Sequence, residues 1–358
     1  MPNTHSQYLG LVLLTLIAST SVSAIPVDLT ARKHTSLDAS STASGKSGSR
    51  TATPSGSSLS PTPSSTNNNS TGGGHAGSDS GLGALFPVPN AVAKWTTLPG
   101  AAGALPLSDA TFKPFKVMSG TTHDYVAAPD GKQAMQAKYP EGSYVPSKKP
   151  AGGFSFYAPG ADAIDFTTAA ELTFGYSVMF PAGFQWNKGG KLPGIYGGDD
   201  PETAVSCSGG RRDPTCFSAR LMWRPEGAGE LYTYLPDPSD PAYAANEKIC
   251  KIPNSECNPT YGASISRGAF TFAAGEWTTV SERVKLNTAG QADGELELFV
   301  GGKSVISVTG IILRDSDKGR MRGIQMQTFF GGSTPDWASP TDQEVFFADF
   351  SVAIIASL

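Results

Sequence analysis

Two short segments, FSARLMW (217–223) and ELYTYL (230–235), alternate between apolar and polar side chains. Because successive side chains of a β-strand point to opposite faces, each segment predicts a strand with one apolar face and one face of potentially functional side chains. The candidate functional residues are Ser218, Arg220, Tyr232 and Tyr234. A guanidinium group surrounded by hydroxyl groups is suited to holding an anionic ligand.

The connecting sequence RPEGAGE is centred on Gly227 and predicts a β-hairpin. A hairpin symmetric about Gly227 places Arg220 opposite Tyr234 and Met222 opposite Tyr232. Facing residues of a hairpin project on the same side of the sheet. We therefore expect one sheet surface to carry the serine, the arginine and both tyrosines.

The charge around this hairpin also favours an anionic ligand. Between Lys188 and Arg224 there are six basic and four acidic side chains, whereas the whole chain has a formal net charge of −4. A local basic cleft attracts an anionic substrate even in an acidic protein. The alternative is a solvated hairpin with surface tyrosines. The acidic balance argues against a nucleic-acid binder, which needs a basic surface.

Other catalytic constellations are scarce in the sequence. His123 is the one histidine after residue 84, so a Ser-His-Asp triad would require it, and no G-x-S-x-G motif precedes a helix. HExxH and phosphate-loop motifs are absent, whereas a glycosidase with paired carboxylates remains open. His123 is itself a candidate substrate contact, with a structural histidine as the alternative.

Two further pairs of polar residues are candidates for the site. Gln325 and Gln327 share one face of GIQMQTFF (323–330) and are expected to hydrogen-bond a sugar, or else to form a solvent face. Asp199 and Asp200 offer oxygen ligands for calcium, although two neighbouring carboxylates in a glycine-rich segment are also typical of a turn. Calcium is thus left open, and no other metal site is predicted.

The four cysteines are Cys207, Cys216, Cys250 and Cys257. Their number is even, and four cysteines allow three disulfide connectivities. We favour the two short-range pairs, Cys207–Cys216 and Cys250–Cys257, which close loops at the rim of the cleft. The spacings are too wide for zinc knuckles of the CxxC type.

Short strands joined by turns are the expected scaffold for these residues. The chain of 358 residues contains 41 glycines and 27 prolines, and only 16% of its residues are charged, which disfavours long helices. Strand patterns recur at 154–158, 171–180, 217–223, 230–235, 277–286, 295–300, 304–308, 323–330 and 345–355. They predict an all-β domain, a jelly-roll β-sandwich of two antiparallel sheets.

Three regions follow one another along the chain. Residues 1–24 contain an apolar run too short to span a membrane, followed by a small-x-small cleavage motif, and predict a signal peptide and secretion. Residues 25–84 are rich in Ser, Thr, Gly and Pro and predict a disordered linker, with Asn68 and Asn69 as glycosylation acceptors. Residues 85–358 form the predicted domain, with no membrane-spanning segment; we expect a monomer.

The motifs in this domain resemble those of polysaccharide lyase family 14, the alginate and polyglucuronate lyases. The resemblance rests on KLPG, on S-x-R, and on Y-x-Y twelve residues after the arginine, with LPGIYGG and FFGG (329–332) in support. It implies a jelly roll whose concave sheet holds the site. The family's functional residues correspond to Lys191, Ser218, Arg220, Tyr232 and Tyr234. Family 20 glucuronan lyases share this fold and are a second match; the cysteine-bounded loops depart from the pattern.

The resemblance implies cleavage of an acidic polysaccharide by β-elimination. Arg220 would neutralise the uronate carboxylate, and Lys191 and Tyr234 are the acid/base candidates, with either as the base. Tyr232 is a helper, Ser218 orients the substrate, and no redox cofactor is needed. The alternatives are a non-catalytic carbohydrate-binding jelly roll and an inactive relative of the lyases.

Overall fold

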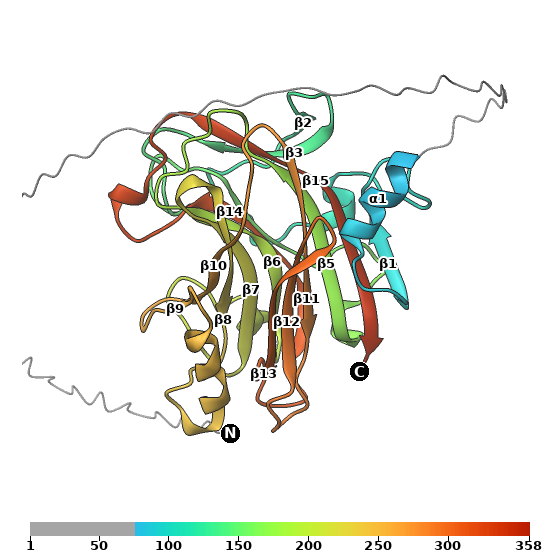
Figure 1. Ribbon diagram of the computed structural model, residues 1–358, viewed down its shortest axis with the longest axis vertical. Helices are drawn as coiled ribbons and strands as arrows, with labels where there is room; N and C mark the ends of the chain where they lie inside the picture. Colours follow the sequence, from blue (N-terminus) through green and yellow to red (C-terminus); the bar gives the residue numbers. More distant parts are fainter. Residues whose placement is uncertain (1–75) are drawn as a thin grey trace, which may run out of the picture. The chain divides into compact units, whose positions relative to one another are not determined.

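Two antiparallel β-sheets face each other across an apolar core in the computed structural model, which describes residues 76–358 (Figure 1). The predicted all-β jelly-roll sandwich is confirmed. The predicted signal peptide, its cleavage site and both glycosylation acceptors lie outside the described residues. None of the helices within 76–358 is long and apolar enough to cross a membrane.

The larger sheet has the strand order β13-β12-β11-β5-β15-β3-β2, with β1 paired to β15. Its strands are β1 (Ala93–Thr96), β2 (Tyr125–Ala127), β3 (Gln133–Tyr139), β5 (Ala169–Met179), β11 (Trp277–Lys285), β12 (Gly294–Val300), β13 (Lys303–Ile311) and β15 (Gln343–Ser357).

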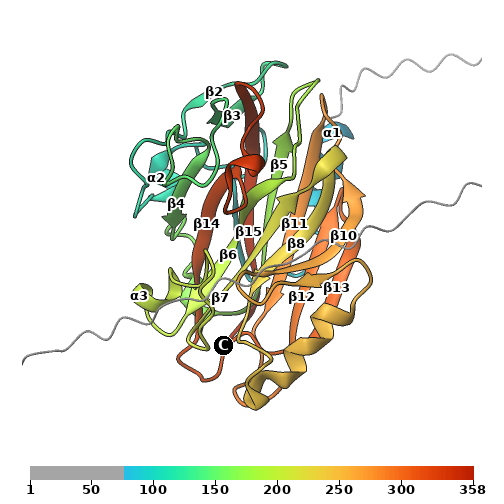
Figure 2. The same ribbon diagram turned by 90° about the vertical axis from the view of Figure 1, so that its left-hand side faces the viewer.

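The smaller sheet has the order β4-β14-β6-β7-β8-β10-β9, and Figure 2 shows its central strands side by side. Its strands are β4 (Phe154–Ala158), β6 (Gly190–Gly198), β7 (Cys216–Trp223), β8 (Ala228–Tyr234), β9 (Glu256–Cys257), β10 (Ala263–Thr271) and β14 (Arg320–Phe330). The helical elements are short: α1 (Ala76–Leu85), α2 (Asp109–Phe112), α3 (Pro201–Ala204), η1 (Phe166–Thr168), η2 (Pro225–Gly227), η3 (Pro241–Lys251) and η4 (Pro335–Trp337).

Alternation along β7 decides which side chains enter the core. Phe217, Ala219, Leu221 and Trp223 belong to the buried core cluster between the sheets. Arg220 and Met222 face the other way and line the outer surface of the smaller sheet. The predicted division of this strand into an apolar and a functional face is therefore confirmed.

The β7–β8 hairpin is centred one residue earlier than we expected. Arg220 lies opposite Tyr232, and Ser218 lies opposite Tyr234. The reason is the turn, which the Arg224 N–H closes by donating to the Ala228 carbonyl at 2.7 Å, so that its midpoint is Glu226. The backbone there is left-handed, with φ of 60° at Glu226. The pairing changes by one position on the same face, so the four residues still share a surface.

Strand β6 is central even though it contains a proline, which cannot donate to a neighbouring strand. The pairing of β6 with β7 shifts register between Leu192 and Gly194, on either side of Pro193. Two side chains of the larger sheet compensate: Tyr176 donates to the Pro193 carbonyl at 3.2 Å, and Glu282 accepts from the Ile195 N–H at 2.5 Å. Sequence reasoning did not assign this strand.

The ordered domain begins before Leu85. Helix α1 covers Ala76–Leu85, and all of these residues except Leu85 fall within the predicted linker, 25–84. Leu85 is buried, and its carbonyl accepts a hydrogen bond from the Ser281 hydroxyl at 3.4 Å. Gly175 leaves room for this contact, because a Cβ there would lie 2.8 Å from the Leu85 oxygen. A buried leucine thus anchors the helix to the larger sheet.

Both favoured disulfide bonds are present, Cys207–Cys216 and Cys250–Cys257. The first closes the loop that leads into β7. The second joins the end of η3 to β9, next to β10. Both loops border the outer face of the smaller sheet, since Ser208 and Glu256 line its groove.

Candidate active site

A groove of about 770 Å³ runs along the outer face of the smaller sheet. Strands β4, β14, β6, β7, β8 and β10 supply its floor, and the loops after β3 and β14 and the two disulfide loops supply its walls. Its lining contains five cationic side chains and one acidic one: Lys148, Lys191, Arg220, Arg224 and Arg267, and Glu256. In a chain of net charge −4, this concentration of positive charge selects anionic ligands.

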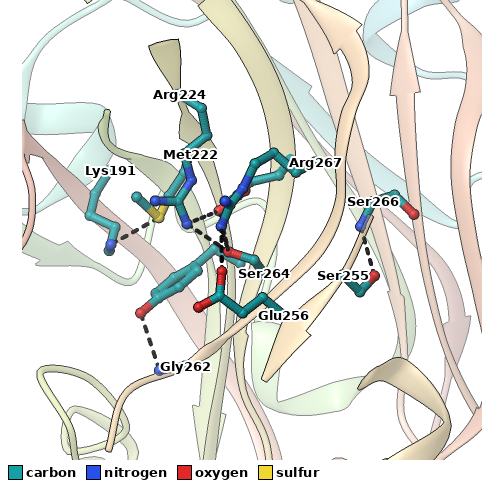
Figure 3. Close-up of polar contacts among 11 residues, drawn as sticks. Lys191, Met222, Arg224, Ser255, Glu256, Gly262, Ser264, Ser266 and Arg267 are labelled. Carbon is teal, nitrogen blue, oxygen red and sulfur yellow. Dashed lines mark hydrogen bonds and ion pairs between the residues drawn. The ribbon is translucent and has the colours of Figure 1, made fainter. Parts of the chain in front are cut away.

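Lys191 points from β6 into this groove. Its amine donates to the Met222 sulfur at 2.9 Å (Figure 3) and lies 3.9 Å from the centre of the Tyr232 ring. Burial of the amine, together with the nearby positive Arg220 and Arg224, lowers the pKa of Lys191 well below its usual value. Lys191 is therefore suited to accept a proton.

Arg220 lies beside Lys191 on β7 and is buried. One terminal nitrogen donates to the Gln327 side-chain oxygen at 2.8 Å, and its Nε has no hydrogen-bond partner. Gln327 is fixed in turn by Gln325, at 2.8 Å, and by Ser155, at 2.9 Å. A fully charged group with unused donors and only neutral hydrogen-bond partners is prepared for an anion.

Tyr232 and Tyr234 stand side by side on β8, with ring centres 5.8 Å apart. The Tyr232 oxygen accepts from the Gly262 N–H at 3.1 Å, and the Tyr234 oxygen accepts from the Gly210 N–H at 3.0 Å. Each hydroxyl hydrogen is therefore left to donate elsewhere. Burial and the neighbouring Tyr234 raise the pKa of Tyr232, so this residue keeps its proton.

The close approach of Gly262 to these tyrosines requires a glycine. A Cβ at this position would lie 2.9 Å from the Tyr234 ring and 3.0 Å from the Tyr232 ring. The backbone N–H can therefore reach the Tyr232 hydroxyl only because no side chain intervenes. Backbone N–H groups thus hold both hydroxyls without any substrate, Tyr232 from Gly262 next to β10 and Tyr234 from Gly210 in the first disulfide loop.

The expected site residues separate into two groups. Lys191, Arg220, Tyr232, Tyr234 and Gln327 line the groove. Gln325, Ser218 and His123 are not among the lining residues. Gln325 is buried and donates to the Gln327 side-chain oxygen. The Ser218 hydroxyl donates to the Cys207 carbonyl at 2.8 Å, where it supports the first disulfide loop.

His123 lies on the other side of β4 from the groove. Its ring packs against the ring of Phe156, 4.5 Å between centres, and Phe156 belongs to the core. The ring Nε2 is 2.9 Å from the Asp109 carboxylate. The expectation of a substrate contact at His123 is therefore not supported, and the structural alternative describes its surroundings.

Asp199 and Asp200 do not form a ligand cluster. Asp200 caps α3, where its carboxylate accepts from the backbone N–H groups of Glu202 and Thr203. Burial raises the pKa of Asp199, with Asp315 contributing. Across residues 76–358 no three His, Cys, Asp or Glu side chains are arranged to hold a metal ion.

Sequence reasoning missed a second charged group in the groove, formed by Arg224, Glu230, Ser264 and Arg267. The alternation that selects Arg220 and Tyr232 continues to Arg224 and Glu230, which could have been found in this way. Nothing local points to Ser264 or Arg267, because β10 was not predicted as a strand.

Two solved structures resemble this chain over most of its length. The marine PL-14 alginate lyase from Aplysia kurodai is 29% identical, with a TM-score of 0.62, over 74% of this chain and 99% of that one. The alginate lyase vAL-1 from Chlorella virus is 26% identical, with a TM-score of 0.58, over 74% of this chain and 100% of that one. The endo-β-1,4-glucuronan lyase from the fungus Trichoderma reesei is more distant, at 12% identity and a TM-score of 0.38 over 70% of this chain and 92% of that one.

No curated protein matches the chain significantly. The family model Polysaccharide lyase 14, however, matches residues 127–350. This range contains β5 to β14 and every residue of the groove from Val145 to Trp337. With a matching family model and a fold shared with two of its enzymes, the chain belongs to polysaccharide lyase family 14.

Proposed function

We propose that this enzyme cleaves a polyuronate by β-elimination, with the reacting uronate held at Arg220. The observation that carries the proposal is one groove that brings together an amine of lowered pKa, a guanidinium with unused donors and two tyrosine hydroxyls. These are the three functions that elimination from a uronate requires: a base, a cation for the carboxylate, and a proton donor.

Each group has a defined task in this reaction. Arg220 binds the carboxylate and stabilises the negative charge that develops when the neighbouring proton leaves. Lys191 takes the proton from carbon 5, and the electron pair of that C–H bond forms the double bond between carbons 4 and 5. The bond from carbon 4 to the linking oxygen breaks, and Tyr234 donates a proton to that oxygen. Tyr232 holds the Lys191 amine over its ring.

The substrate class follows from the relatives. Two structurally similar enzymes are named alginate lyases, and the motifs of this sequence also resemble those of glucuronan lyases. We therefore place alginate first and glucuronan second among the substrates. Incubating the enzyme with both polymers and following the ultraviolet absorbance of unsaturated ends tests the proposal. Products with saturated ends would identify a hydrolase, and binding without any product would identify a carbohydrate-binding module.

We further propose that the enzyme is secreted and acts as a monomer. The apolar run at residues 8–18, the small-x-small motif before Ile25 and two disulfide bonds support secretion, because disulfides persist in oxidising compartments. Secreted product whose N-terminus is Ile25, and a light-scattering mass of one chain, are the expected results. Retention in the cell with an intact N-terminus contradicts secretion.

A further inference from the structure

A second charged cluster occupies the groove beyond Lys191, and Figure 3 shows its contacts. Glu230, on β8, is completely buried beneath the groove surface. Arg224 donates to one Glu230 oxygen at 2.6 Å, and Arg267 donates to the other at 3.0 Å. The Ser264 hydroxyl completes the cluster by donating to Glu230 at 2.7 Å. One buried carboxylate thus holds two guanidinium groups that both line the groove.

The cluster has a surplus of positive charge on its groove side. One carboxylate neutralises one of the two arginines, and the Nε of Arg224 has no hydrogen-bond partner although Arg224 is more than nine-tenths buried. The remaining compensation is Glu256, whose oxygen is 3.2 Å from Arg267. The Glu256 side chain is 63% exposed, and such ion pairs contribute little. An arriving carboxylate can therefore take its place.

The second disulfide loop positions this cluster. The pairing of β10 with β8 is interrupted between Ile265 and Phe270, and a bulge of this kind redirects side chains. Within the bulge, the Ser266 N–H donates to the Ser255 hydroxyl and the Arg267 N–H donates to the Asn254 carbonyl, both at 2.9 Å. The loop that the Cys250–Cys257 disulfide closes thus supports Arg267 and also supplies Glu256.

The distance between the two charged groups suits a polymer. Arg220, Met222 and Arg224 follow one another on the same face of the chain, and four residues of extended strand span about 13 Å. That length exceeds one sugar ring. Trp337 lies at the same end of the groove, with its ring centre 5.8 Å from the Arg224 guanidinium carbon, and aromatic faces are common partners for sugar rings.

We propose that Arg224 and Arg267, held by Glu230, form a second carboxylate subsite for a uronate unit removed from the one at Arg220. The proposal rests on the proposed function, since it assumes a polyuronate in the groove. The enzyme then requires acidic units at two positions of the chain, and a polymer with an isolated uronate binds weakly. The competing explanation is that the cluster only joins β7, β8 and β10.

Substitutions that remove a positive charge at Arg267 or a negative charge at Glu256 distinguish a carboxylate subsite from a purely structural cluster. Arg267→Gln removes a cation from the subsite, and we expect it to weaken binding of an alginate hexasaccharide about tenfold or more. Glu256→Gln removes the competing carboxylate, and we expect it to tighten binding about threefold. Arg267→Lys keeps the charge and is expected to stay closer to the parent than Arg267→Gln. If the cluster only joins the three strands, neither Arg267→Gln nor Glu256→Gln should tighten binding of the hexasaccharide.

The Lys251–Glu247 ion pair provides matched controls outside the groove. Its side chains are 70% and 62% exposed, and neither residue lines the groove. Lys251→Gln and Glu247→Gln change the net charge in the same way as the two test variants, and we expect affinities within about twofold of the parent. A carboxyl-reduced hexasaccharide serves as the second control, since its affinity should not respond to Arg267→Gln.

Binding is measured by calorimetry with the full chain carrying Lys191→Ala, so that the probe is not cleaved, and melting temperatures confirm folding. Opposite shifts for Arg267→Gln and Glu256→Gln support the subsite; shifts in one direction, or no shift beyond the controls, overturn it. If Arg267→Gln does not fold, Arg267→Lys and Glu256→Gln decide. Binding without cleavage by the unmodified enzyme contradicts the proposed function and leaves the subsite test intact. Absence of any binding overturns the subsite, and the product assay with the unmodified enzyme then decides the proposed function separately.

Discussion

The outer faces of the two sheets both carry arginines on central strands, but the arginines are paired very differently. On the larger sheet, Arg283 of β11 lies 2.5 Å from Glu171, 2.9 Å from Glu295 and 3.4 Å from Glu297. On the smaller sheet, Arg220 of β7 contacts the neutral Gln327. Among residues 76–358 no acidic side chain forms an ion pair with Arg220 or Lys191. The larger sheet thus satisfies the charge of Arg283 within the fold, whereas on the smaller sheet Arg220 and Lys191 have no acidic partner among the described residues.

The difference has an energetic meaning. Burying a charge without an opposite partner is unfavourable, so such a group persists where another benefit outweighs its cost. Arg283 is compensated within the fold and needs no further explanation. Arg220 is not, and in the reaction we propose the substrate carboxylate supplies the missing charge. The Lys191 amine is also buried without an acidic partner in the described part of the chain, and this burial is the main reason that its pKa is lowered. The pairing state of a charged residue, rather than its presence, distinguishes the active face.

The largest effect is expected from the proton-transfer residues. Tyr234→Phe keeps the ring and its packing but removes the hydroxyl, and Lys191→Ala removes the amine. Each is expected to lower kcat about 100-fold or more, with little change in KM, because the lost step occurs only during the reaction. Steady-state kinetics on alginate test this. Full activity of Tyr234→Phe would show that the proton donor lies elsewhere.

The lowered pKa of Lys191 also predicts the pH dependence. A neutral amine is the active form, so kcat/KM should rise with pH through the pKa of Lys191, and this rise should occur below the usual lysine value of about 10.4. Lys191→Ala should remove that limb from the residual activity. A pH–rate profile with the same limb in both proteins would assign the ionisation to another group.

Arg220→Ala is expected to have the next largest effect and a different kinetic signature. Arg220 holds the carboxylate in the ground state and in the transition state, so its loss should raise KM and lower kcat together. We expect kcat/KM to fall roughly 10- to 100-fold, the range for hydrogen bonds to charged groups. Arg220→Lys should recover only part of this, since lysine cannot bind a carboxylate bidentately. An unchanged KM would contradict the role of Arg220 in binding.

How much of the groove face of the smaller sheet could be predicted depends on whether a feature is set by neighbouring residues or by distant ones. The alternation of apolar and polar side chains is a local pattern, and it identified the two faces of β7 and β8. Each of the predicted strand segments also corresponds to an observed strand. The hairpin register depended on the turn closed by Arg224 and Ala228, which alternation does not determine. His123 was misplaced because a loop histidine shows no periodicity that reveals which side of β4 it will pack against.

Other features depend on contacts between distant segments. Strand β6 carries Lys191 yet contains Pro193, and its central position is sustained by Tyr176 and Glu282 from the other sheet. Arg267 reaches the groove through a bulge fixed by the second disulfide loop. Neither β6 nor the bulge in β10 can be recognised from the sequence of its own segment. Lys191 was identified through the family resemblance, which rests in part on the KLPG motif, because β6 itself was not predicted as a strand.

A smaller effect, confined to stability, is expected for Arg283 and its glutamate partners on the outer face of the larger sheet. Arg283→Met leaves Glu171, Glu295 and Glu297 without their shared cation, and we expect the free energy of unfolding to fall by about 1–2 kcal/mol, more than for a fully exposed pair because the Arg283 side chain is only 16% exposed. Denaturant titration measures this loss. Both kcat and KM should stay at the values of the unmodified enzyme. A loss of activity without a loss of stability would break the comparison between the two faces.

The smallest effect is expected at the point where the two sheets meet, at Glu282. Burial raises the pKa of this carboxyl well above its usual value, so the folded protein keeps a proton that the unfolded chain releases above about pH 4.3. The folded state then binds more protons than the unfolded state, and stability must fall as the pH rises above about 4.3.

The Glu282→Gln variant tests this dependence. Its side chain cannot ionise, yet its side-chain oxygen can still accept from the Ile195 N–H that steadies β6 beside Lys191. We therefore expect the variant to gain about 1 kcal/mol over the unmodified enzyme between about pH 5 and pH 8, with kcat unchanged. Glu282→Leu leaves the Ile195 N–H unpaired and should lower both stability and kcat. Parallel stability curves for the unmodified enzyme and Glu282→Gln would show that Glu282 is ionised in the fold, and that the sheets are joined by a charge rather than by a neutral hydrogen bond.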